Sequence, residues 1–353
     1  MGSEGCGALK VVSHVVRAFS VIALSSVAAH AQSREPRYAE RVDVERVLVD
    51  VRVVDSAGQA LLGLGADDFK VKIGGKPVAV QSVMWVGGAD ENVNERSQPV
   101  ERRGSTDREP QGRLIVFLLQ KDLEPSRIVG LMRMLVEAQG FLDGLTPHDR
   151  VAILSFDSHL KIWLDFTSDR DRLLRVLKHG ILFEDPPAVH AVSSPSLLGH
   201  LNPATARKTY PIEKALRVIA EALHDLPGSK SVVLIGHGFG RLGWTGVSME
   251  HGYSEARNAL VAARASVFSL DVTNADYHSL EAGLQLVSSQ TGGFFARTHL
   301  FVEQAMRRLA GALAGYYVLF VERPDVGQGT HKIEVDLIHR AATVLARNTF
   351  AVP

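Results

Sequence analysis

Two carboxylates directly follow an apolar run in this sequence. The stretch from Ile115 to Ser126 is IVFLLQKDLEPS, in which Gln120, Asp122 and Glu124 succeed five apolar residues. Carboxylates two residues apart in a loop can chelate Ca²⁺ or Mg²⁺, because hard cations prefer oxygen ligands. His237 follows a second apolar run, and a neutral imidazole suits a softer ion. Asp122, Glu124 and His237 are therefore a candidate metal site.

Enzyme motifs are incomplete. The sequence GHGFG at 236–240 stands where a G-x-S-x-G nucleophile elbow would, but its centre is Gly238, which has no hydroxyl. The same glycines lack the last spacing of G-x-G-x-x-G. The 14 histidines are scattered, and none forms an H-E-x-x-H motif. We therefore predict that the protein is not an enzyme. A hydrolase with an unrecognised site is the less favoured alternative, and it predicts a deep pocket with pKa-shifted groups.

Composition and charge describe a folded protein without a preference for polyanions. The chain has 353 residues, of which 46% are hydrophobic and 22% charged, as in globular proteins. Lys+Arg and Asp+Glu each total 39, so no net charge attracts nucleic acid. A nucleic-acid partner is not expected.

The N-terminus has the pattern of a secretory signal peptide. Lys10 and Arg17 precede an apolar run from Ala18 to Ala29, and Ala29-His30-Ala31 offers a small-x-small cleavage site. The run of about 12 residues is shorter than the roughly 20 that span a bilayer, and no later segment is long and apolar enough. We predict a signal peptide over 1–31 and export to the periplasm or beyond. The single cysteine, Cys6, lies within it, so the mature chain would have neither disulfides nor thiolate zinc sites.

The rest of the chain divides by its hydrophobic pattern. Strand-like alternation of apolar and polar residues predicts an N-terminal β module over 41–87. The charged stretch 88–112 is predicted to be a flexible linker. Strands alternating with helices over 113–315 predict an α/β domain with a doubly wound, mainly parallel sheet and helices on both faces. The segment 316–353 returns to strands. Because the two β segments flank the α/β domain, we expect them to form one small accessory β module.

Several segments resemble one family. Three segments, in their order along the chain, are similar to segments of von Willebrand factor type A (VWA) proteins, and more narrowly of the VWFA-related acidobacterial domain family. They are DRVAILSFDSHLKIWLDFTSDRDRLLRVL, SQTGGFFAR and YYVLFVERPDVGQGTHKIEVDL. The resemblance spans nearly all of the predicted mature chain. It implies a Rossmann-like fold and a role in adhesion or protein interaction. It also implies a metal-dependent adhesion site, formed by Asp-x-Ser-x-Ser after the first strand, a later Thr, and an Asp after the fourth strand.

None of these family ligands is kept at its position. Gln120 stands at the first Asp, Asp122 and Glu124 at the two serines, Tyr210 at the threonine with Thr209 one place away, and His237 at the last Asp. The resemblance therefore implies a degenerate metal site, and we expect no metal or other cofactor. A divalent cation held by Asp122, Glu124 and His237 is the alternative.

The predicted function is an exported, non-enzymatic protein-interaction module; the alternative is a cation-dependent VWA binding protein. Another protein is the expected partner. Trp244 follows the fourth strand, where it either contacts the partner or packs under its own loop. The candidate partner-binding residues are Gln120, Asp122, Glu124, Ser126, Thr209, Tyr210, His237, Arg241 and Trp244.

Overall fold

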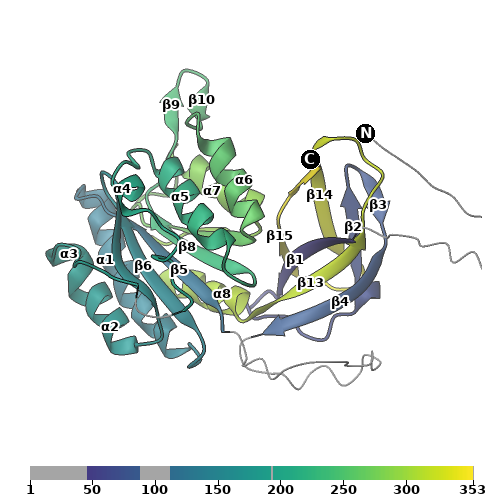
Figure 1. Ribbon diagram of the computed structural model, residues 1–353, viewed down its shortest axis with the longest axis horizontal. Coiled ribbons are helices and arrows are strands. Elements are labelled where there is room, and N and C mark those ends of the chain that lie inside the picture. The colour runs from purple at the N-terminus through teal and green to yellow at the C-terminus, as the bar shows by residue number, and fades with distance from the viewer. Residues whose placement is uncertain (1–45, 88–111, 192–193, 353) are drawn as a thin grey trace, which may run out of the picture. The chain divides into compact units, whose positions relative to one another are not determined.

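The computed structural model describes residues 46–87, 112–191 and 194–352 (Figure 1). The predicted signal peptide lies outside these residues, and so does the predicted linker except for Gly112. None of the helices in the described ranges combines the length and the apolar character that a membrane crossing requires.

A six-stranded sheet forms the centre of the α/β domain. Its strands lie in the order β12-β11-β8-β5-β6-β7. They are parallel except for β7, which pairs antiparallel with β6. Every residue of β5, β8 and β11 is buried, as expected of strands covered on both faces. The strands are β5 (Leu114–Gln120), β6 (Arg150–Phe156), β7 (Leu160–Thr167), β8 (Lys230–Gly236), β11 (Ala265–Asp271) and β12 (Phe295–Arg297).

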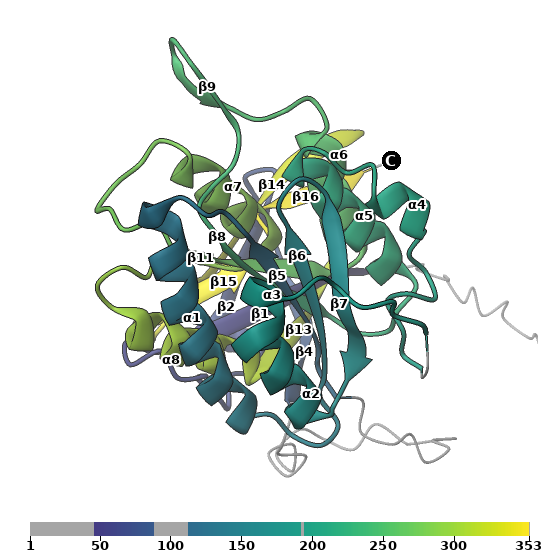
Figure 2. The ribbon, with the colours of Figure 1, turned by 90° about the vertical axis from the view of Figure 1, so that its left-hand side faces the viewer.

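Helices cover both faces of this sheet (Figure 2). Ile115, Phe117 and Leu119 of β5 face α1 (Pro125–Asp143), α2 (Arg170–Arg175) and α8 (Val302–Leu313). Val116 and Leu118 face α5 (Ile212–His224), α6 (Tyr253–Ala262) and α7 (Glu281–Thr291). A π-helical turn (Val176–Gly180) and the short helices α3 (Ile181–Phe183) and α4 (Pro203–Ala206) lie between β7 and α5. The predicted doubly wound sheet is thereby confirmed.

The two flanking β segments form one accessory module, as predicted. Its two four-stranded sheets have the orders β15-β1-β13-β4 and β16-β14-β2-β3, so each combines N-terminal and C-terminal strands. Val49, Val51, Ile73, Tyr317 and Leu319 are buried in their shared core. The strands are β1 (Arg46–Val54), β2 (Phe69–Ile73), β3 (Lys76–Val78), β4 (Val80–Gly87), β13 (Gly315–Glu322), β14 (Gly329–Leu337), β15 (Thr343–Ala346) and β16 (Thr349–Val352), with a 3-10 turn at Ala66–Asp68.

Candidate functional site

The candidate residues lie where the strand order of the sheet reverses. The chain passes from β5 to β6 on one side, and later places β8 on the other side of β5. Loops leave the carboxyl ends of β5 and β8 at this point in opposite directions, which is where open α/β sheets commonly bind ligands. Asp122 and Glu124 follow β5, and His237 follows β8. The fold therefore brings these segments to one edge of the sheet, called here the strand-end face.

The buried side chain of Gln120 connects the end of β5 to the loop after β8. Its side chain is 7% exposed. Its Nε2 donates to the carbonyl of Gly238 at 2.9 Å, and its Oε1 accepts from the backbone N–H of His237 at 3.1 Å. This amide thus satisfies two backbone groups of the β8 loop.

Replacing Gln120 with leucine is expected to lower the free energy of unfolding by about 2 kcal/mol, because leucine leaves two backbone groups without their partner. Urea denaturation measures the change. Gln81→Leu is the matched control, since Gln81 is exposed and its amide contacts only an exposed glutamate, Glu322, at 3.3 Å. An equal effect of the two substitutions would show that the buried hydrogen bonds of Gln120 are unimportant.

Arg127 binds both carboxylates of the β5 loop. Its guanidinium forms an ion pair with Asp122 Oδ2 and lies 3.0 Å from Glu124 Oε2. Glu124 also accepts from the Ser126 hydroxyl at 2.7 Å. Burial opposes the ionisation of Asp122, but the Glu124 backbone N–H and the Arg127 guanidinium outweigh it and hold the pKa of Asp122 below its usual value. A divalent cation on this carboxylate pair would have to displace the guanidinium.

His237 is held as a neutral imidazole. Its side chain is 11% exposed, and its Nε2 lies 3.7 Å from Asp122 Oδ2. Burial lowers the pKa of His237 to about 4, and the positive charge of Arg127 contributes to this decrease. Its Nδ1 is buried without a hydrogen-bond partner among the described residues.

Thr209 and Tyr210 have opposite environments. Thr209 is fully buried; its hydroxyl donates to the Ala206 carbonyl at 2.6 Å and accepts from the Leu160 N–H at 2.8 Å. Thr209 therefore connects the loop before α5 to the first residue of β7. Tyr210 is 72% exposed and remains available to a partner.

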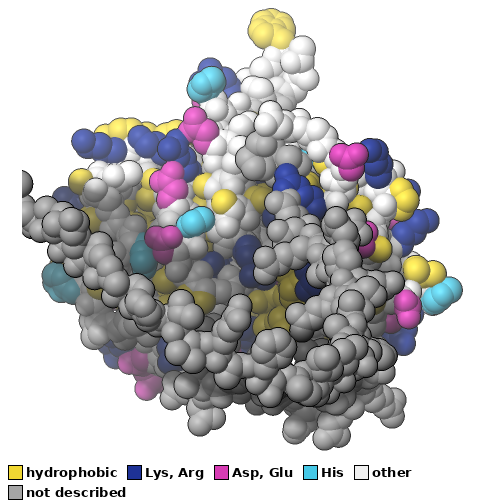
Figure 3. All heavy atoms as spheres, turned by 45° about the vertical axis from the view of Figure 1, so that its right-hand side comes forward, with side chains coloured by type: hydrophobic (Ala, Val, Ile, Leu, Met, Phe, Trp, Pro, Cys, Tyr) yellow, Lys and Arg dark blue, Asp and Glu magenta, His cyan; other side chains and the backbone are white. Residues whose placement is uncertain are grey.

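Arg241 and Trp244 belong to a hairpin where the sequence analysis expected a loop. The strands β9 (Arg241–Gly243) and β10 (Gly246–Ser248) pair antiparallel. Arg241 pairs with Glu250, with its Nε 3.1 Å from Oε1. Trp244 is fully exposed and Leu242 largely so. The hairpin projects from the surface and carries a hydrophobic side chain at its tip (Figure 3). Of the two alternatives for Trp244, packing under its own loop does not occur.

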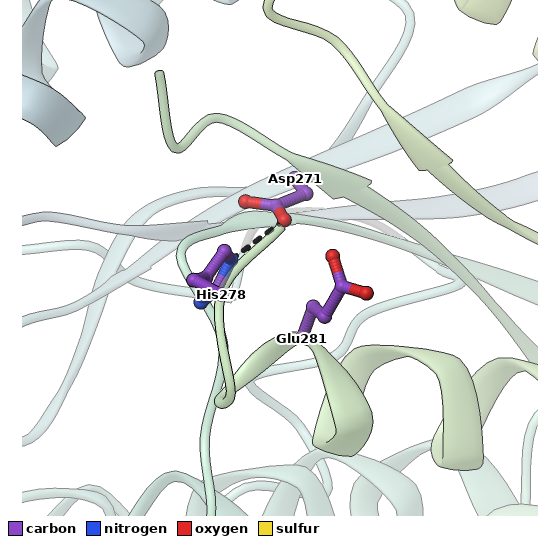
Figure 4. A group of neighbouring side chains, drawn as sticks. All are labelled: Asp271, His278 and Glu281. Carbon is purple, nitrogen blue, oxygen red and sulfur yellow. Dashed lines mark hydrogen bonds and ion pairs between the residues drawn. The ribbon is translucent and has the colours of Figure 1, made fainter. Parts of the chain in front are cut away.

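One group of three metal-ligand-type side chains occurs among the described residues, and the sequence analysis did not find it. Asp271 ends β11, His278 lies in the next loop, and Glu281 begins α7. The three side chains point toward one another (Figure 4). His278 and Glu281 are three residues apart where this loop meets α7, a short separation that could have indicated the pair. Their proximity to Asp271 depends on the turn after β11.

A large cavity lies at the opposite edge of the sheet. Its volume is about 920 Å³, and Leu114, Arg150 and Ser231, at the amino ends of β5, β6 and β8, contribute to its wall. The hydrolase alternative predicted a deep pocket with shifted groups. Arg52 and Asp225 line it and have shifted pKa values, since burial lowers the pKa of Arg52 and a hydrogen bond from His224 lowers that of Asp225. His237 is on the carboxyl edge and does not line this cavity.

Comparison with known proteins gives structural similarity alone. No protein-family model and no curated protein matches the chain. The conserved hypothetical protein BatB from Bacteroides thetaiotaomicron aligns with a TM-score of 0.38 and 16% identity, covering 57% of this chain and 97% of that one. An aerotolerance-related membrane protein from Bacteroides fragilis aligns with a TM-score of 0.37 and 16% identity, covering 57% of this chain and 98% of that one. A von Willebrand factor type A protein from Catenulispora acidiphila aligns with a TM-score of 0.41 and 7% identity, covering 87% of this chain and 75% of that one.

The architecture agrees with the resemblance found in the sequence. The mainly parallel sheet has helices on both faces, and its strand order reverses at β5. The segments that carry the resemblance form β6, β7 and α2, the end of α7 with β12, and the strands β13 and β14. The α/β domain therefore has the arrangement of strands and helices that the resemblance implies, and both of its flanks contribute to one accessory β module.

Proposed function

We propose that the strand-end face binds another protein through exposed aromatic side chains, without a metal at the family positions. The observation that carries this proposal is the concentration of these side chains. The described residues include five exposed aromatics, Phe183, Tyr210, Trp244, Tyr277 and Phe301. All except Phe183 lie on loops that follow β8, β11 and β12 or precede α5.

Exposed aliphatic side chains extend the same surface. Leu123, Leu242 and Leu300 are each at least 65% exposed, and they follow β5, β8 and β12. Tyrosine and tryptophan are enriched at the energetically dominant positions of protein interfaces, because each buries a large rigid surface at a low entropic cost. Seven such exposed side chains at one edge of the sheet favour a protein partner over contact with solvent.

The carboxylates of the β5 loop favour binding without a metal. Both are neutralised by Arg127, so they need no external cation. The cation-dependent alternative requires Asp122 and Glu124 to release this guanidinium. Export remains part of the proposal, supported by the N-terminal pattern of basic, apolar and small residues.

Site-specific photocrosslinking in the native cells tests the proposed face. A benzophenone amino acid placed at Trp244, Tyr210 or Phe301 is expected to give the same discrete crosslinked protein from each position. Met84 is the control, since it is also exposed, at 45%, but belongs to β4 of the accessory module. The proposal fails if the three positions give no common product, or if Met84 gives that product equally well.

A further inference from the structure

We propose that Asp271, His278 and Glu281 bind one divalent transition-metal ion of the Zn²⁺ type. The group lies at the end of β11 and the start of α7, whereas the family positions lie after β5, before α5 and after β8. Its residues are separate from Asp122, Glu124 and His237. The proposed protein-binding face does not require this ion, and the two proposals can fail independently.

The geometry is close to that of a three-ligand site. The ligand atoms of the three side chains all lie within 4.8 Å of one another, and His278 Nε2 is 2.7 Å from Asp271 Oδ2. Bonds from zinc to nitrogen and oxygen of about 2.0–2.2 Å place neighbouring ligand atoms about 3.4 Å apart around a tetrahedral ion. Metal binding therefore requires His278 and Asp271 to separate slightly, and Glu281 to share its carboxylate with Arg297 or to release that guanidinium.

The charge of Asp271 favours an added cation. Asp271 and Glu281 are each 1% exposed. Arg297 neutralises Glu281, with its Nε 2.8 Å from Oε2 and its Nη2 2.6 Å from Oε1. Among the described residues, Asp271 has an ion pair with His278 alone. A buried carboxylate is costly without a compensating charge. The ring nitrogen facing Asp271 marks the position at which a metal ion would supply this charge.

Neighbouring groups orient the proposed ligands. The Thr273 N–H donates to Asp271 Oδ1 at 2.9 Å, which leaves Oδ2 directed toward His278. Gln285 Nε2 donates to Glu281 Oε1 at 2.9 Å, and Arg297 holds the same carboxylate from the other side. Hydrogen bonds of this kind fix the orientation of metal ligands and raise affinity.

The ligand types select the class of ion. One imidazole nitrogen and two carboxylate oxygens suit zinc and similar first-row ions, whereas Ca²⁺ and Mg²⁺ prefer sites made of oxygen alone. Three protein ligands leave a position for water or for a group from a partner. We therefore expect Zn²⁺ to bind clearly more tightly than Mg²⁺.

Metal titration of the tag-free full chain tests the site. After treatment with EDTA and dialysis, calorimetric titration with ZnCl₂ is expected to show one saturable site, and Zn²⁺ is expected to raise the melting temperature because it binds the folded state. MgCl₂ should give neither signal. Absence of saturable Zn²⁺ binding would overturn the proposal, and equal binding of Mg²⁺ would overturn its assignment to a transition metal.

Substitutions locate the ion. His278→Gln and Asp271→Asn are each expected to weaken Zn²⁺ binding by roughly 100-fold or more, since each removes a direct ligand. His251→Gln is the control, because His251 is exposed and outside the group. Circular dichroism shows whether each variant is folded. If folded His278→Gln binds Zn²⁺ as tightly as the unmodified chain, the ion is elsewhere and the proposal is wrong.

Discussion

Replacing Gly130 with alanine is expected to lower the free energy of unfolding by about 3 kcal/mol, because an added methyl group has no space there. A Cβ at this position would lie 1.8 Å from the Val272 carbonyl oxygen and 2.8 Å from its carbon. These are backbone atoms at the end of β11, so no rotamer change relieves the overlap. Helix α1 and this loop would have to separate.

Gly140 of the same helix provides the matched control. An added Cβ there meets nothing within 4 Å, and the residue is exposed. Gly140→Ala should raise stability by about 0.5–1 kcal/mol, since alanine has the higher helix propensity. The urea concentrations at the midpoints of unfolding of the two variants should therefore shift in opposite directions from that of the unmodified chain. Equal midpoints would show that α1 does not approach β11 as closely as the structure indicates.

The contact at Gly130 also affects the candidate site. The Ser126 carbonyl, in the first turn of α1, accepts from the Asn274 N–H at 2.8 Å. The same turn carries Arg127, which binds Asp122 and Glu124. Displacing α1 would therefore move the cation of the β5 loop as well as the helix. Gly130 helps to fix the geometry of the strand-end face.

Acidification is expected to destabilise the protein through His237. Its pKa is about 4 in the folded state, against about 6.5 for an unperturbed histidine. Between these values the unfolded chain binds a proton that the folded chain does not, so the free energy of unfolding falls as the pH falls. The shift corresponds to about 3 kcal/mol, fully present as stability above pH ~6.5 and lost below pH ~4.

A variant that cannot titrate isolates this contribution. His237→Gln should lose less stability between pH ~6.5 and pH ~4 than the unmodified chain, by about 3 kcal/mol. Urea denaturation across this range, in EDTA, measures both curves. His251→Gln serves as the control, because His251 is exposed. Parallel curves for His237→Gln and the unmodified chain would contradict a buried, neutral His237.

Hydrophobic patterning predicted the fold because buried strands and helices require apolar residues at a regular spacing along the chain. The apolar run from Leu114 to Leu119 became the fully buried strand β5. Alternation between strands and helices predicted the doubly wound sheet, and the β segments on either side of it predicted the accessory module. Each of these features depends on neighbours along the chain.

The environment of the polar side chains was decided only by the tertiary structure. Thr209 and Tyr210 are adjacent in sequence, yet one is fully buried and the other is 72% exposed. The Glu124–Arg127 pair could have been inferred from the spacing of three residues at the start of α1. By contrast, Glu281 is neutralised by Arg297, sixteen residues away. The sequence by itself determined the doubly wound α/β frame and the accessory β module. The close packing of the loops at the carboxyl edge decided which charges pair and which aromatics meet solvent, because distances between separate loops are set by packing and not by spacing in the chain.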